Sequence, residues 1–201
     1  MNDTTAREDL AWIRSLMDHS HRFLGGTWRH QAVWGLVGSL GMLSTYLAVR
    51  ATRYELIPWL WVGAVGAGWF YSLVLAREHD RAPIVRNAAS QAFGGIWISL
   101  GVTLTLIGGI SIFTGALAPQ ALSGVVAALF GAGYFASGFV AGLRWLQAVA
   151  VAWWIGATVL LVWASPHGLL LLAVMTVVLA IGPALRLRQL EQEAPYPPTA
   201  D

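Results

Sequence analysis

The chain has 201 residues, of which 57% are hydrophobic and only 11% are charged, and its formal net charge is +2. Soluble domains average about 25% charged residues, so this composition excludes an ordinary soluble domain and predicts an integral membrane protein. The absence of cysteine excludes disulfides and thiolate metal sites. All twelve basic residues are arginine, so no lysine can form a Schiff base.

Residues 1–26 are predicted to form an amphipathic helix and a hinge at Gly25 and Gly26. Arg7, Arg14 and Asp18 lie on the face opposite the apolar one. Charges occur throughout this segment, so it is not a cleavable signal peptide. We expect the helix to lie at the membrane surface, either as a plain anchor or as a docking surface. Its apolar face comprises Leu10, Ile13, Leu16, Met17, Phe23 and Leu24.

Six apolar runs follow, each long enough to cross a hydrocarbon core of ~30 Å as a helix. None contains Asp, Glu, Lys, Arg or His. They predict an all-α domain over residues 27–188, built from three helical hairpins. Pro183 is expected to bend or end the last span, and residues 189–201 are predicted to be a disordered cytoplasmic tail. The predicted spans are 31–49, 56–76, 93–113, 120–142, 145–164 and 169–185.

The arginines set the expected orientation of these spans. With the N-terminus inside, ten of the twelve arginines lie in cytoplasmic segments, and only Arg50 and Arg53 lie outside. The positive-inside rule therefore predicts that both termini face the cytoplasm. Trp59 and Trp61, at the start of the second span, are expected to be interfacial anchors.

The first two hairpins resemble one another in sequence. The motif Q-A-x-x-G-x-x-x-S-L-G over residues 31–41 recurs over 91–101, and the block over 66–72 recurs over 131–137. The alternative is chance self-similarity in a chain rich in Gly, Ala, Ser and Leu. A true repeat would place a ridge of small residues on the second and fourth spans, where it permits close helix packing. This predicted ridge comprises Gly68, Ser72, Ala76, Gly133, Ser137 and Ala141.

Three glutamines lie near the predicted cytoplasmic ends of the odd-numbered spans, and an arginine precedes each one. The functional interpretation is a vestibule that faces an anion or a lipid headgroup. The structural interpretation is ordinary polarity at helix starts, with charges that fix the topology. The residues concerned are Gln31, Gln91, Gln147, Arg29, Arg86 and Arg144.

Catalytic chemistry is absent at membrane depth. No span contains a Ser–His pair, paired carboxylates or an H-E-x-x-H motif, so we predict no catalytic residue, no cofactor and no metal site. Ion-coupled transport usually needs charged groups within the spans, and no basic patch predicts nucleic-acid binding. Hydroxyls that could line a path for a neutral solute are Ser39, Thr45, Ser72, Ser99, Thr103, Thr105, Ser137 and Thr158.

The segment L-x-x-I-R-x-L-M-D-x-S over residues 10–20 precedes an aromatic residue, the glycine hinge and a glycine-rich span. This arrangement, over residues 10–41, resembles the opening of small uncharacterised bacterial six-span inner-membrane proteins. The resemblance implies an inner-membrane location and carries no activity with it.

The sequence thus favours a non-catalytic membrane component in contact with lipids, which associates with itself or with a membrane-protein partner in an accessory or sensor role. The alternative is a carrier or channel for a neutral or lipophilic small molecule, without ion coupling. A third possibility is an enzyme or cofactor-binding subunit.

Overall fold

The computed structural model describes residues 28–80, 88–163, 165 and 167–193. The predicted amphipathic helix over 1–26, Arg86 and the tail from 194 lie outside these residues. The described chain is helical apart from short turns and contains no strand. Six of its helical segments are long and apolar enough to cross a membrane, with mean hydropathies of 1.5 to 2.5. This confirms the all-α, six-span fold class.

The first five spans are single helices: α2 (Trp28–Arg50), α3 (Ile57–Asp80), α4 (Ala88–Thr114), α5 (Pro119–Ala141) and α6 (Arg144–Val162). A 3-10 helix, η1 (Tyr54–Leu56), leads into α3. The sixth span combines α7 (Gly168–Thr176), the π-helix η2 (Val177–Ile181) and α8 (Gly182–Glu193).

A tight turn joins α5 to α6. Gly142 has a φ of +68°, which glycine adopts without steric cost. The N–H of Leu143 bonds back to the carbonyl of Gly138 at 2.8 Å, which satisfies a carbonyl that the helix end leaves free. Pro119 begins α5, where a missing N–H has no consequence. Local sequence therefore sets both ends of α5.

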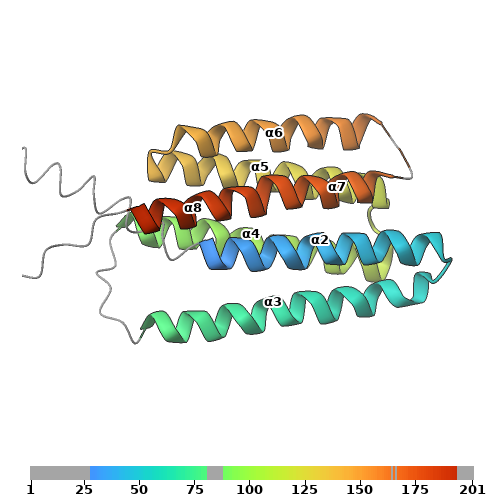
Figure 1. Ribbon diagram of the computed structural model, residues 1–201. Coiled ribbons are helices and arrows are strands. Elements are labelled where there is room, and N and C mark those ends of the chain that lie inside the picture. Colours follow the sequence, from blue (N-terminus) through green and yellow to red (C-terminus); the bar gives the residue numbers. More distant parts are fainter. Residues whose placement is uncertain (1–27, 81–87, 164, 166, 194–201) are drawn as a thin grey trace, which may run out of the picture.

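The six spans lie side by side, with their ends at two levels (Figure 1). The start of α2, the end of α3, the start of α4, the α5–α6 turn and the end of α8 lie at one level. The described arginines at this level are Arg29, Arg77, Arg144, Arg186 and Arg188. Arg50 and Arg53 lie at the opposite level. We call the first level the arginine-rich end; by the positive-inside rule it is predicted to face the cytoplasm.

The best-buried part of the bundle is aromatic. Trp153 of α6 is fully buried, and its ring stacks on Phe130 and Tyr134 of α5 at centroid distances of 4.9 and 6.4 Å. In α3 and α4 only 11% of the residues in each span window are buried, against 28 to 39% in the other four spans. The bundle therefore has a well-packed side around α5 and α6 and a more open side formed by α3 and α4.

The helix of the sixth span does not end near residue 185: α8 continues to Glu193, so the prediction that residues 189–193 are disordered is wrong. Pro183 has no N–H for the carbonyl of Leu179, four residues earlier. The indole N–H of Trp153, on α6, donates to that carbonyl at 3.3 Å instead. The π-helix carries the backbone into the proline, with the N–H of Gly182 bonded to the carbonyl of Val177. A neighbouring helix therefore satisfies the carbonyl that the proline leaves free.

Candidate functional site

Four tryptophans pack on a neighbouring helix in the same way. Each indole ring lies against a glycine, and its N–H donates to a Ser or Thr hydroxyl four residues further along the same helix. Residues four apart share one helix face, so the glycine makes room for the ring and the hydroxyl satisfies the donor. We call these the Trp–Gly contacts. They join Trp61 to Gly41 and Thr45, Trp34 to Gly68 and Ser72, Trp69 to Gly101 and Thr105, and Trp97 to Gly133 and Ser137.

The donor–acceptor distances in these contacts are short. They measure 2.9 Å for Trp61, 2.9 Å for Trp34, 3.3 Å for Trp69 and 3.0 Å for Trp97. A hydroxyl that receives an indole N–H removes an unsatisfied donor from the hydrocarbon, where such a group would cost several kcal/mol. The contacts therefore hold successive spans together without a hydrophobic driving force.

The predicted ridge of small residues lies beside an indole ring in each hairpin, although the side chain nearest to a Cβ added at Gly133 is that of Leu100, at 2.9 Å, with the Trp97 ring at 3.9 Å. A Cβ added at Gly68 would lie 3.0 to 3.2 Å from three ring atoms of Trp34. Ser137 is fully buried. The third member of each ridge takes no part in these contacts: Ala76 is exposed and Ala141 is half-buried. Sequence reasoning found the ridge and missed its partner, although Gly-x-x-x-Ser/Thr and a tryptophan on the next span were both visible.

The contacts are equivalent in the α2–α3 and α4–α5 hairpins. Trp34 meets Trp69 edge-on at a centroid distance of 5.6 Å and an angle of 78°, and Trp97 meets Tyr134 at 5.2 Å and 83°. These pairs correspond at offsets of 63 and 65 residues. The glutamine motif has an offset of 60, which would align Trp34 with Gly94. The Trp34 and Trp97 contacts therefore follow a register about one helical turn away from the motif, whereas Gly41 and Thr45 correspond to Gly101 and Thr105 at the motif's own offset of 60.

Trp61, which the sequence predicts to be an interfacial anchor, packs on the neighbouring helix. Its indole lies across Gly41 of α2, and its N–H donates to Thr45. Trp59, two residues earlier, is 71% exposed, which suits an anchor at the membrane surface. Residues two positions apart in a helix point to different faces, so Trp59 and Trp61 have different surroundings.

Most of the hydroxyls that could line a solute path are already hydrogen-bonded within the protein. Ser72 and Ser137 accept indole N–H groups. Those that donate to a backbone carbonyl three or four residues earlier are Ser39, Thr45, Ser99, Thr105 and Thr158. Within the described part of the chain, Thr103 makes no side-chain hydrogen bond. Such back-bonding is the usual role of hydroxyls in membrane spans.

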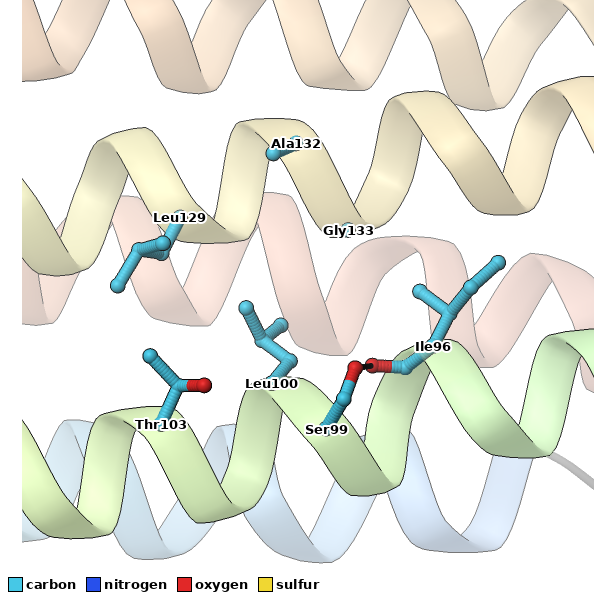
Figure 2. A pocket seen from close by; sticks show the side chains of 7 residues that line it. All are labelled: Ile96, Ser99, Leu100, Thr103, Leu129, Ala132 and Gly133. Carbon is cyan, nitrogen blue, oxygen red and sulfur yellow. Dashed lines mark hydrogen bonds between the residues drawn. The ribbon is translucent and has the colours of Figure 1, made fainter.

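Thr103 lies in a shallow groove of about 270 Å³ between α4 and α5 (Figure 2). The α4 side of this groove carries two hydroxyls, and the Ser99 hydroxyl donates to the carbonyl of Ile96 at 2.9 Å. The α5 side is apolar. The groove can hold an apolar chain and offers no acid, base or metal ligand. Its lining residues are Ile96, Ser99, Leu100, Thr103, Leu129, Ala132 and Gly133. Across the described residues, no group of three His, Asp or Glu side chains could hold a metal.

Gln31 is 6% exposed, and among the described residues neither atom of its amide has a hydrogen-bond partner. It faces the sixth span, because Gly35, one turn later on α2, lies against Ala180 and Ile181. An unpaired buried amide costs roughly 1 to 3 kcal/mol. Because Gln31 is buried against the sixth span, it is part of the helix packing despite this cost.

The other glutamines occupy different surroundings. Gln91 is exposed on α4, and Gln147 lies against Gly138 of α5. Arg29 and Arg144 are exposed at the arginine-rich end, and Arg86 lies outside the described residues. No predicted vestibule residue lines the α4–α5 groove.

These features define the class of protein: a multi-pass, all-α membrane protein with an aromatic interior and interhelical tryptophan hydrogen bonds. Comparison of the chain with family models, with curated proteins and with solved structures gave no match. Its function must therefore be inferred from its own residues.

Proposed function

We propose that the protein is a non-catalytic component of the bacterial inner membrane, which associates with a second copy or with another membrane protein in an accessory or sensor role. The observation that carries this proposal is the uneven covering of the glycines. On α2, α5 and α6, a Cβ added at any glycine would meet a side chain of a neighbouring helix. The glycines that face open space within the first five spans are all on α3 and α4: Gly63, Gly66, Gly94, Gly95, Gly108 and Gly109.

Open glycines have a specific meaning in a membrane span. Glycine in a helix interior is about 1 kcal/mol less favourable than alanine, and within lipid it permits the close helix approach that drives association. In α2, α5 and α6 the protein uses this space for its own side chains. The α3 and α4 spans are also the least buried in the bundle. These two observations support association through the α3–α4 side.

Crosslinking tests the proposal directly, because the chain has no cysteine of its own. Gly66→Cys on α3 and Gly95→Cys on α4 would each carry a thiol-attached photocrosslinker in native membranes. Ile155→Cys on α6, which is 62% exposed, is the matched control. We expect crosslinked dimers or protein adducts from the two glycine positions, and lipid adducts alone from the control. Protein adducts from the control at an equal yield would contradict the proposal.

A carrier of a lipophilic small molecule is the second candidate. The observation in its favour is the α4–α5 groove, with the hydroxyl of Thr103 lacking a protein partner within the described chain. A long-chain alcohol that bears a photoreactive group should then label the segment 96–103, and excess unlabelled alcohol should suppress that labelling. Equal labelling of all lipid-facing helices would exclude this candidate.

A further inference from the structure

The arginine-rich end carries five described arginines, and Glu78, Asp80, Glu191 and Glu193 lie at the same end. Among the described side chains the one ion pair joins Arg53 to Glu55, at 3.8 Å, and it lies at the opposite end. Guanidinium groups near the surface of a membrane attract anionic headgroups by about 1 kcal/mol each. An exposed arginine at this end, such as Arg186 on α8, can therefore attract the anionic headgroup of a lipid in the same leaflet.

A hollow of about 450 Å³ lies on the exposed face of α8 at this end. Helix α8 runs outward toward the arginine-rich end (Figure 1). At 1.5 Å per residue, Arg186 and Gln189 lie roughly 6 and 10 Å further out than Gly182. Gly182 and Leu185 therefore make the deeper part of the hollow apolar, Arg186 and Gln189 supply hydrogen-bonding groups further out, and Leu190 is the outermost lining residue. Its lining residues are Gly182, Leu185, Arg186, Gln189 and Leu190.

Arg186 is held in place at this hollow. Its guanidinium carbon lies 5.3 Å from the centroid of the Trp145 ring on α6, a distance at which a cation and an aromatic face attract one another. The side chain of Arg186 is exposed, and its planar group of N–H donors matches the oxygens of a phosphate. A positioned guanidinium therefore stands beside a hollow that extends toward the hydrocarbon.

We propose that this hollow binds one anionic phospholipid, with its phosphate on Arg186 and Gln189 and an acyl chain along Leu185 and Gly182. From Gly182 to Gln189, the order of polarity along α8 matches the order of chain and headgroup in a lipid of this leaflet. A zwitterionic lipid would place its own positive group near the guanidinium of Arg186. A soluble phosphate would leave the apolar part of the hollow unfilled.

Retention of lipid by the purified full-length protein tests the proposal. The protein in detergent is mixed with phosphatidylglycerol or with phosphatidylcholine, and bound lipid is measured by native mass spectrometry. We expect phosphatidylglycerol to bind more tightly, and Arg186→Gln to weaken its binding about fivefold, as ~1 kcal/mol per arginine implies. Arg50→Gln at the opposite end is the control and should change nothing. Equal binding of phosphatidylglycerol by Arg186→Gln and the parent would overturn the proposal.

A second variant separates a shaped site from surface charge. Leu185 is 49% exposed, so Leu185→Trp fills the hollow without disturbing the core and keeps every arginine. We expect it to reduce phosphatidylglycerol binding as well. If Leu185→Trp binds this lipid as the parent does, charge alone attracts the lipid and no site exists. If inorganic phosphate displaces the lipid at equimolar concentration, the ligand is a soluble anion and the lipid assignment is wrong.

Discussion

A tryptophan within a membrane span carries an N–H that lipid cannot satisfy. Six described tryptophans meet this requirement by donating to a neighbouring span. Trp34, Trp61, Trp69 and Trp97 donate to hydroxyls, and Trp153 and Trp154 donate to the carbonyls of Leu179 and Ala128. Together these bonds connect every successive pair of spans. The same residues supply contact area and hydrogen bonds, so the bundle is held by features that operate in an apolar solvent.

The pair Gly68 and Gly66 on α3 tests this account at single residues. Gly68→Ala places a methyl group 3.0 to 3.2 Å from the Trp34 ring, and we expect overpacking to destabilise the protein by about 1 to 3 kcal/mol. Gly66→Ala meets open space, and we expect it to be neutral or stabilising by up to ~1 kcal/mol. Unfolding of both variants in the same detergent, followed by tryptophan fluorescence, measures the difference. If both variants lose the same free energy of unfolding, contact with the Trp34 indole does not explain which positions on α3 accept a larger side chain.

The sequence predicts part of this arrangement at the residue scale. The spacing of Gly68 and Ser72 reveals a face of small residues, because that spacing depends on one helix alone. The indole of Trp34 that covers this face depends on how α2 and α3 rotate against each other. No local pattern encodes that rotation. The burial of Gln31 could not be predicted for the same reason, since its position next to the sixth span follows from long-range packing.

The bounds of single helices were predicted best where an apolar run ends at a turn residue followed by an arginine. The predicted bounds of α5 and α6 differ from the observed ones by no more than two residues, because Gly142 and Arg144 mark the turn between them. The helix of the sixth span continues past Pro183, although local sequence rules predict that a proline bends or ends a helix. Trp153, 26 residues before Leu179, supplies the donor that Pro183 lacks, and a bond between separate helices is invisible to a local rule.

A double-mutant cycle tests this role of Trp153. Trp153→Phe should leave the Leu179 carbonyl unpaired and destabilise the protein by roughly 1 to 3 kcal/mol. Pro183→Ala restores an N–H four residues after that carbonyl, so Trp153→Phe should cost less in that background. Urea or heat unfolding of the four proteins in one detergent gives the coupling free energy. Strict additivity of the two substitutions would mean that the indole and the proline act independently.

Across the whole molecule, the three sequence hairpins do not form three separate packing units. The first span contacts the sixth: the Thr176 hydroxyl lies 3.8 Å from the sulfur of Met42, and the Tyr46 hydroxyl lies 3.0 Å from Nδ1 of His167. These contacts join the N-terminal and C-terminal spans, while α3 and α4 remain the open side. The apolar runs of the sequence predicted the number of spans, since each span needs about 20 apolar residues to cross the membrane. They could not predict which spans meet, because lipid-facing and buried faces are equally apolar here.

The distribution of the arginines predicts how the whole bundle is oriented in the membrane. The ends of the spans alternate between two levels, and the arginine-rich end contains every described arginine except Arg50 and Arg53. Because translocation of arginine is disfavoured, this end should stay in the cytoplasm. Reporter fusions should read cytoplasmic after Asp80, Arg144 and Glu193, and external after Arg53, Gln120 and His167. Glu193 is the right position for the last cytoplasmic fusion because α8 extends to it. An external signal after Asp80, with cytoplasmic signals after Arg53 and Gln120, would show that the bundle inserts the other way round.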